Sequence, residues 1–394
     1  MNLPQPIRYG RAQATQSPLG AASLVQQGDR RRAELSLGAS QGLQSSLFHG
    51  WIRMMEWSKG GAENVDRCPA CGATAFMPAY TRRDDLLSMP DTWEMPRCSS
   101  CASVFLAVRP DATSIHRAYE DYPTHHDGDA DQGIPSGGIV GALIRGYLQQ
   151  RFCLEVPGRT LRAGHLLFSL IEPFRLKLDR FGRHVHLKRG RRADLRLMDV
   201  GCGNGGFLSL AGRMGIQASG IDPDPKAAAL AQRKGLDVRL GGFDLLAAEH
   251  ERYDIVTMNQ VVEHVFDQRE LLSSCFGALK KDGLLWLAYP NPEALGLKVF
   301  GSAWCALHPP YHICLTTQAQ MCRLLADAGF KDIKVHRRGT HARVHWRDSA
   351  AIAQAHGIAL PSAGFRHLAR WACDGLATLT PRWAEEVVIT AVKP

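Results

Sequence analysis

From about residue 195 to residue 394, short apolar runs alternate with stretches of helical periodicity. The runs rich in β-forming residues are LRLMDV, QASGID, YDIVTM, GLLWLAYP, KDIKVH and EEVVITAVK. Alternation of strands and helices is typical of a parallel sheet with helices packed on its faces. The pattern predicts an α/β domain over residues 195–394.

The chain before residue 195 has a different pattern. GGIVGALIRGYLQQRFCLEV and GHLLFSLIEPFRLKLDRF place apolar residues every three or four positions, which predicts amphipathic helices. Residues 1–66 are rich in Gln, Ser, Gly, Ala and Arg and lack sustained periodicity, which predicts a disordered leader. We therefore divide the chain into this leader, a cysteine-bearing segment (67–106), a helical linker or lid (107–194) and the α/β domain.

Composition places the chain among ordinary globular proteins. Hydrophobic residues make up 45% and charged residues 22% of its 394 positions, and no window holds 18 uninterrupted apolar residues. The first twenty residues lack the features of a secretory signal, so we expect a cytoplasmic protein without a transmembrane segment. The net charge of +9 is compatible with nucleic acid, phospholipid or a phosphorylated substrate, and does not choose among them.

Four of the eleven cysteines form a pattern. CPAC supplies Cys68 and Cys71, and CSSC supplies Cys98 and Cys101. Two C-x2-C knuckles provide four thiolates for tetrahedral zinc, as in zinc ribbons. Redox-active pairs are the alternative, but two neighbouring pairs in one small segment favour metal. We expect a closed, structural zinc site, and we expect the other cysteines to be small buried hydrophobic residues in a reducing compartment.

LMDVGCGNGGFL combines the end of a buried strand with the start of a helix. Gly201, Gly203 and Gly205 therefore fall in a strand-to-helix turn at the carboxyl edge of the sheet, where glycine permits positive φ and close approach of a ligand. Asp222 ends the next strand, where an acidic side chain can accept hydrogen bonds from ribose hydroxyls. The combination predicts a site for a nucleoside-containing cofactor.

The glycine spacing is G-x-G-x-G preceded by Asp199, not the G-x-G-x-x-G of dinucleotide sites. LMDVGCGNGGF, GIDPDP, YDIVTMNQVVEHV and LKKDGLLWLAYPNP together resemble the motifs of class I S-adenosylmethionine-dependent methyltransferases, in their order and spacing. The resemblance covers roughly residues 195–337 and returns in the last strand. It implies a Rossmann-like, seven-stranded, mostly parallel sheet with helices on both faces, preceded here by a small zinc ribbon.

The resemblance also implies roles for individual residues. Asp199 and the turn from Gly201 to Gly205 would hold the methionine part of S-adenosylmethionine, and Asp222 the ribose. Gly242 and Phe243 would border the adenine, and Asn259 would lie under the sulfonium. The full set implied for the cofactor is Asp199, Gly201, Cys202, Gly203, Asn204, Gly205, Asp222, Pro223, Gly242, Phe243 and Asn259. Two alternatives stay open: Phe243 as an ordinary core residue, and Asp222 as the N-cap of the following helix.

Methyl transfer to a hydroxyl needs a group that accepts the proton. VVEHV places Glu263 and His264 just beyond the fourth strand, and HPPYHICLTT supplies His308 and His312 after the fifth. We predict His264 or His312 as the base, with Glu263 beside them; His264 could instead cap a helix or pack against the pocket. Small-RNA 2′-O-methyltransferases of the same superfamily bind magnesium through Glu-x-x-Glu-His. Gln260 replaces the first of those carboxylates here, so we predict no catalytic metal.

A zinc ribbon ahead of this domain resembles bacterial methyltransferases of cell-surface glycan and natural-product pathways. The resemblance implies a small-molecule or glycan acceptor, lipid-linked or nucleotide-activated, methylated on a sugar hydroxyl. One alternative is an RNA methyltransferase, although the acidic and apolar DDLLSMPDTWEM within the ribbon counts against nucleic acid. Another is a non-catalytic cofactor-binding scaffold.

Two further segments have open roles. YEDYPTHH could form part of a substrate lid or serve only packing, and its candidate residues are Tyr119, Tyr122, His125 and His126. A basic run could attract phosphate or an anionic membrane surface, and we favour a solvated linker; its members are Arg180, Arg183, Lys188, Arg189, Arg191 and Arg192.

Overall fold

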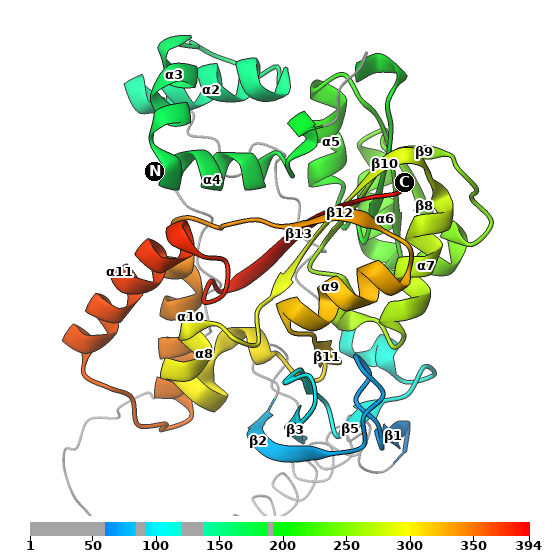
Figure 1. The fold of residues 1–394 in the computed structure, drawn as a ribbon, viewed down its shortest axis with the longest axis vertical. Helices are drawn as coiled ribbons and strands as arrows, with labels where there is room; N and C mark the ends of the chain where they lie inside the picture. The colour runs from blue at the N-terminus through cyan, green and yellow to red at the C-terminus, as the bar shows by residue number, and fades with distance from the viewer. Residues whose placement is uncertain (1–59, 84–90, 120–136, 188–191) are drawn as a thin grey trace, which may run out of the picture.

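A seven-stranded sheet forms the centre of the protein (Figure 1). The computed structural model describes residues 60–83, 91–119, 137–187 and 192–394, so most of the predicted leader (1–66) lies outside the described residues. The prediction of disorder is wrong for its last part, because Ala62–Asn64 form strand β1, which is paired with Val108–Pro110. The strands lie in the order β12-β13-β10-β9-β6-β7-β8, and only β13 is antiparallel to its neighbours. Their bounds are β6 (Arg196–Val200), β7 (Gln217–Asp222), β8 (Asp237–Leu240), β9 (Tyr253–Asn259), β10 (Leu279–Pro290), β12 (Lys331–Val335) and β13 (Glu386–Val392). The predicted Rossmann-like class is confirmed.

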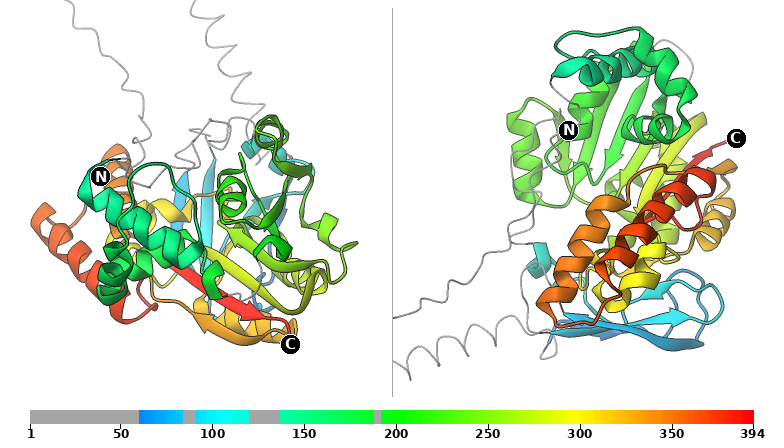
Figure 2. Two further views of the ribbon diagram at one scale, coloured as in Figure 1. Left: turned by 90° about the horizontal axis from the view of Figure 1, so that it is seen from above. Right: turned by 90° about the vertical axis from the view of Figure 1, so that its left-hand side faces the viewer.

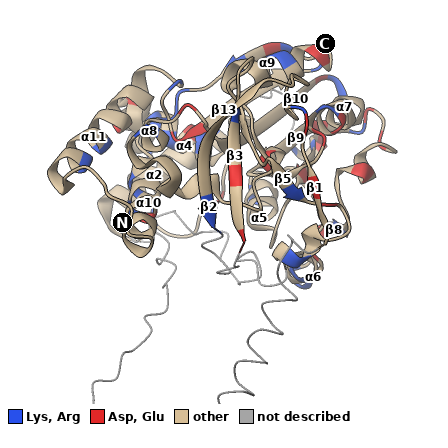
Figure 3. Cartoon of the chain, turned by 90° about the horizontal axis from the view of Figure 1, so that it is seen from below, with Lys and Arg blue, Asp and Glu red and all other residues tan. Residues whose placement is uncertain are grey.

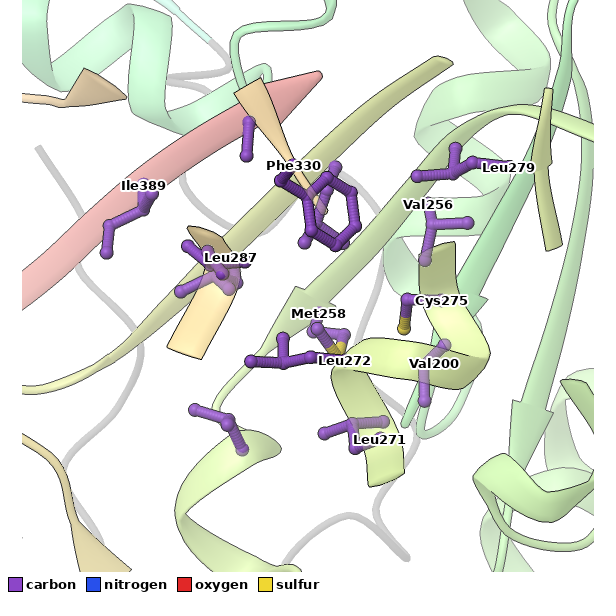
Figure 4. Packing of buried hydrophobic residues seen from close by; sticks show 14 of the residues in the cluster. Val200, Val256, Met258, Leu271, Leu272, Cys275, Leu279, Leu287, Phe330 and Ile389 are labelled. Carbon is purple, nitrogen blue, oxygen red and sulfur yellow. The ribbon is translucent and has the colours of Figure 1, made fainter. Parts of the chain in front are cut away.

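Helices cover both faces of this sheet, because its central strands are apolar on both sides. Along β6, Leu197 packs into the core on one face and the next residue, Met198, into the core on the other. One face carries α2 (Gly138–Phe152), α5 (Gly206–Arg213) and α6 (Pro225–Arg233), and the other carries α7 (Gln268–Ala278) and α9 (Gln318–Asp327). Figure 4 shows the core under α7, where strand and helix side chains interdigitate.

The helices predicted upstream of the sheet are present. The second predicted stretch forms two helices, α3 (Ala163–Leu170) and α4 (Glu172–Phe181), separated at Ile171. The break has a local cause: Pro173 lies in the first turn of α4, where its missing N–H costs no helical hydrogen bond, and Ile171 before it is extended. Arg183, two residues beyond the end of α4, contacts Asp199 near the carboxyl end of β6.

The cysteine-bearing segment contributes three strands of a four-stranded sheet, and the fourth strand comes from the α/β domain. Its order is β11-β4-β3-β2, with β2 (Phe76–Arg83), β3 (Thr92–Cys98), β4 (Val104–Phe105) and β11 (Cys314–Leu315). A short pair, β1 (Ala62–Asn64) with β5 (Val108–Pro110), lies beside it. Because β11 comes from within the α/β domain, the two parts share a sheet; Figure 2 shows this small sheet below the central one.

A helical hairpin is inserted between β12 and β13. It consists of α10 (Ala342–Ala355) and α11 (Ala363–Leu379), and it packs on α8 (Leu295–Phe300). The buried Glu385 carboxylate accepts hydrogen bonds from the indoles of Trp304 (2.7 Å) and Trp346 (2.8 Å), which fixes the hairpin to the start of β13. Among the described residues, no helix combines the length and apolar character needed to cross a membrane.

Candidate functional site

The glycine-rich turn follows β6 at the carboxyl edge of the sheet. Gly201, Gly203 and Gly205 have φ values of 67°, 54° and 78°, a region that residues with a Cβ seldom occupy. A Cβ on Gly201 would lie 2.5 Å from the Val261 side chain, so a larger residue could not be placed there without moving the chain. Both the backbone angles and the space therefore require glycine at Gly201.

Asp222 closes the neighbouring strand and faces the same turn. One carboxylate oxygen accepts the Gly203 N–H at 2.6 Å, and the other accepts the Asp224 N–H at 2.9 Å. The N-cap of α6 is Asp224, whose side chain accepts from Lys226 and Ala227, so the alternative role of Asp222 as this N-cap is wrong. Main-chain donors therefore hold its carboxylate in place, and each oxygen keeps a second lone pair.

Asp199 lies one residue from the end of β6 and is almost fully buried. One oxygen accepts from the Thr257 hydroxyl (2.8 Å) and from the Arg183 guanidinium, whereas the other has no hydrogen-bond partner among the described residues. Burial raises the pKa of Asp199 in spite of Arg183. An orphaned, buried carboxylate oxygen beside the glycine turn fits the ammonium group of an amino-acid ligand.

Two arginines of the basic run contribute to this site. The Arg183 guanidinium is buried between Asp199 and the ring of Phe207, with the guanidinium carbon 3.6 Å from the ring centroid. Arg180 donates to Asn259 at 2.7 Å and forms an ion pair with Glu386. The preferred interpretation of the run as a solvated linker is therefore wrong at these two positions, because buried carboxylates require cationic partners. Lys188, Arg189 and Arg191 lie outside the described residues.

Glu386, the first residue of β13, binds side chains from several other segments at this edge of the sheet. Its carboxylate accepts from Arg180, from Arg338 at 2.6 Å and from Gln260 at 2.9 Å. Burial alone would raise the pKa of Glu386, but the two arginines outweigh it and hold the pKa below the usual range. Sequence reasoning missed this network; its signal was a pair of acidic residues at the head of an otherwise apolar strand.

The remaining predicted cofactor residues lie around the same edge. Asn204 accepts from the Gly206 N–H (3.3 Å) at the start of α5, and Cys202 is buried. Pro223 is exposed, and Phe243, which follows Gly242, is half-buried against the main core. The packing of Phe243 is compatible with both roles given above, so the adenine contact stays a prediction.

Glu263, His264 and His312 come together beyond β9. The Nε2 atoms of His264 and His312 lie 3.9 Å and 4.0 Å from one Glu263 carboxyl oxygen. The Nδ1 atom of His264 is bonded to the carbonyl of Tyr311 (2.9 Å), and that of His312 to the carbonyl of Ala306 (2.8 Å). A carbonyl only accepts, so both Nδ1 atoms carry the proton and both Nε2 atoms present a lone pair toward Glu263.

Burial controls the charge of these three groups. It lowers the pKa of His264 to about 4 and that of His312 well below its usual value, and it raises the pKa of Glu263 to about 8. Neither carboxyl oxygen of Glu263 has a hydrogen-bond partner in the described part of the chain. At neutral pH the cluster therefore holds two neutral imidazoles and a protonated carboxyl group, and it can accept a proton.

The same donor set could hold a divalent cation, because the ligand atoms converge within 4.8 Å of one another. Backbone-bonded Nδ1 atoms are the usual support of metal-binding imidazoles. Two nitrogens and one oxygen suit zinc, manganese or iron(II) better than magnesium. The prediction that no catalytic metal binds stays a prediction.

Two other predicted residues lie beside this cluster. The Tyr119 hydroxyl is 3.1 Å from His264 Nδ1, so one residue of the proposed lid segment reaches the histidines. His308 stacks on Tyr311, with ring centroids 4.5 Å apart. Tyr122, His125 and His126 lie outside the described residues.

The four paired cysteines also converge, in a geometry suited to zinc. The Sγ atoms of Cys68 and Cys101 are 3.7 Å apart, and those of Cys71 and Cys98 are 3.6 Å apart. A tetrahedron with Zn–S bonds of about 2.3 Å has S···S edges of about 3.8 Å. The knuckles are equivalent turns, since Gly72 donates to the Cys68 carbonyl as Ala102 donates to that of Cys98. The geometry favours a shared ion over two redox pairs.

We expect one zinc ion per chain and a loss of both metal and stability in Cys98→Ser. The start of α9 contacts both knuckles: Gln320 donates to the Ala70 carbonyl (3.0 Å) and Thr317 to that of Cys101 (2.9 Å). Loss of the ion should therefore lower the melting temperature of the α/β domain as well. Elemental analysis and thermal unfolding measure the two effects, with the exposed Cys153→Ser as control. Full retention of stability by metal-free Cys98→Ser would contradict a structural ion.

Comparison with known proteins agrees with this geometry. A family described as a methyltransferase domain matches residues 164–335. The chain is 30% identical over 174 residues to a ubiquinone biosynthesis O-methyltransferase of Chelativorans sp., covering 40% of this chain and 69% of the relative. It is 36% identical over 118 residues to the protein of that name from Cereibacter sphaeroides, covering 28% of this chain and 48% of the relative. The chain thus spans about half the length of several curated relatives that it matches.

Solved structures resemble the chain at lower identity. A SAM-dependent methyltransferase from Archaeoglobus fulgidus is 22% identical, and the match covers 57% of this chain and 94% of that one with a TM-score of 0.39. A possible histamine N-methyltransferase from Thermotoga maritima is 16% identical, with 64% and 100% covered and a TM-score of 0.38.

Proposed function

The chain belongs to the family of S-adenosylmethionine-dependent methyltransferases, and from that premise we propose that it transfers the methyl group to a hydroxyl of a small-molecule or glycan acceptor. The observation that carries the proposal is the pairing of two sites at one sheet edge. A glycine turn flanked by Asp199 and Asp222 lies after β6 and β7, and a buried, neutral histidine pair lies after β9.

The first site would bind S-adenosylmethionine. Asp222 would accept the ribose hydroxyls, and the orphaned oxygen of Asp199 would accept the ammonium of the methionine part, with Arg183 holding the other Asp199 oxygen in place. Asn259, which accepts a hydrogen bond from Arg180, ends β9, the strand that precedes the histidine cluster. The cofactor itself supplies the electrophilic methyl group, and the protein aligns it and excludes water.

The second site moves the proton. A hydroxyl loses its proton as it attacks the methyl carbon, and an imidazole Nε2 of His264 or His312 receives it. Both imidazoles are neutral before the reaction because burial holds their pKa values down. Glu263, whose carboxyl oxygen lies 3.9 and 4.0 Å from the two Nε2 atoms, can relay this proton: it passes its own proton to the second imidazole and takes up the one carried by the first, so the carboxyl group stays protonated. A cation held by these three residues would lower the pKa of the acceptor hydroxyl.

The zinc ribbon has a positioning role in this proposal. His312 lies two residues before β11, which pairs with β4 of the ribbon. Ile313, between them, donates to the Glu263 carbonyl at 2.8 Å and accepts from the Leu106 N–H at 3.1 Å. The ribbon therefore holds the segment that carries His312 against the segment that carries Glu263.

We propose a sugar hydroxyl of a glycan or natural-product precursor as the acceptor, and a precursor in ubiquinone biosynthesis, the pathway named for the relatives, as the second candidate. The relatives support transfer to oxygen, since each is named as an O-methyltransferase. RNA is a weaker candidate, because Arg180 and Arg183 are engaged by carboxylates inside the protein and are not free to bind phosphates.

The test has two stages. Calorimetric titration with S-adenosylhomocysteine should give a single site per chain. Incubation with methyl-labelled S-adenosylmethionine and separate pools of lipid-linked saccharides, nucleotide sugars, demethylated quinone precursors and RNA should label one pool. Binding without labelling of any pool would favour the cofactor-binding scaffold, and labelling of RNA alone would overturn the proposed acceptor class.

A further inference from the structure

Helix α11 presents an apolar face to solvent. Phe365, Leu368, Trp371 and Leu379 recur at helical spacing along it and are 53%, 70%, 57% and 72% exposed. Its inner face is buried through residues such as Cys373 and Ala377. A surface helix normally turns such side chains inward, so this outward apolar stripe lacks a partner within the described chain.

Arginines lie directly beside this stripe. Between α10 and α11 a shallow, open cavity of about 250 Å³ is lined by Arg343, Arg347, Arg366 and Arg370, and no acidic side chain lines it. Arg347 and Arg370 pair with Asp348 (2.9 Å) and Asp374 (3.2 Å), whereas Arg343 has no ionic partner among the residues described. Figure 3 shows basic residues in blue on α10 and α11. The cavity is suited to an anionic group such as a phosphate.

A second exposed apolar group continues the face. At the junction of α3 and α4, Leu166, Leu170 and Phe174 are 67%, 75% and 40% exposed. The junction adjoins the end of α11, because Arg337 pairs with Glu172 of α4 and donates to the carbonyl of Thr378 on α11 (3.1 Å). Figure 1 places α3, α4 and α11 on the same side of the molecule.

We propose that α11, together with the α3–α4 junction, docks onto a membrane surface rich in anionic phospholipid. The apolar side chains enter the boundary between headgroups and acyl chains, and the arginine cavity takes a lipid phosphate. Helices that lie in a membrane interface typically carry aromatic and leucine side chains on one face, with arginines beside them. A second copy of the chain fits less well, because a symmetric contact would bring two sets of the same arginines together.

Membrane docking is tested by sedimentation with vesicles. The protein should bind vesicles of an equimolar mixture of phosphatidylcholine and phosphatidylglycerol, and bind vesicles of phosphatidylcholine alone far more weakly. The double variant Leu368→Glu/Trp371→Glu should lose at least about tenfold in partitioning, and Arg343→Gln should lose about fivefold on the anionic vesicles only. Met77→Glu, at a 54% exposed position on β2, is the matched control and should bind like the wild type.

Two further readouts separate the outcomes. The affinity of each variant for S-adenosylhomocysteine shows that it is folded, and this measurement stands independently of vesicle binding. Analytical ultracentrifugation reports self-association. The proposal is overturned if the wild type binds neither kind of vesicle or binds both kinds equally. It is also overturned if Leu368→Glu/Trp371→Glu partitions onto anionic vesicles as strongly as the wild type. A dimer that this double variant converts to monomer, without vesicle binding, would assign the face to a second copy instead.

Discussion

Asp222→Ala is expected to weaken binding of S-adenosylmethionine and S-adenosylhomocysteine by about 100-fold or more, because two hydrogen bonds to a charged acceptor are lost. The carboxylate is fixed by the Gly203 and Asp224 main-chain donors before any ligand arrives, so little ordering is needed on binding. Isothermal calorimetry with the product measures the change directly.

Asp224→Ala is the matched control, since it removes a neighbouring carboxylate that caps α6 and has no predicted contact with the cofactor. It should cost about 1 kcal/mol of stability and leave the affinity within about twofold of the wild type. Equal affinities for Asp222→Ala and the wild type, with both proteins folded, would mean that the ribose lies elsewhere and that the glycine turn is not the cofactor site.

The sequence predicts best those parts of the site whose residues lie close together along the chain. The glycine turn and Asp222 lie within one strand–turn–helix–strand unit, and each is required by its own backbone or its own strand end. A residue in a turn needing positive φ is visible in a single sequence, because the constraint acts on that residue alone. Six of the seven strands of the central sheet fall on the predicted apolar runs, which are local signals too, whereas β8 was not among these runs.

The part that the sequence does not predict depends on pairing between distant segments. From the sequence alone, Arg183 and Arg180 were interpreted as surface charges. Their partners, Asp199 and Glu386, are 16 and 206 residues away along the chain, so the sequence pattern does not reveal the pairing. Likewise β11 is only two residues long and has no strand signature of its own; it is a strand because β4 is beside it. Hydrophobic periodicity indicates which positions of a helix or strand face the core. It carries no information about which buried charge a residue at such a position contacts.

Glu263→Gln is expected to lower kcat by about 10²- to 10⁴-fold while the affinity for S-adenosylhomocysteine stays unchanged. The substitution keeps the shape of a fully buried side chain and removes the group that exchanges protons with His264 and His312. Because neither Glu263 carboxyl oxygen is bonded within the described structure, the variant removes no side-chain hydrogen bond that supports the fold there. Exposed Glu270→Gln, on α7, is the control.

The pH profile and the metal content then separate the roles of the cluster. A histidine base must be neutral to act, and burial lowers the pKa of His264 to about 4. The acid limb of the rate profile should therefore lie well below pH 6.5, the ordinary value for histidine, with activity lost as pH falls through it. If a chelator abolishes turnover at neutral pH and a transition metal restores it while the zinc ribbon stays loaded, the cluster works through a bound ion. If turnover survives the chelator but Glu263→Gln is fully active, the proton does not leave through these residues, and the acceptor must be one that needs no base.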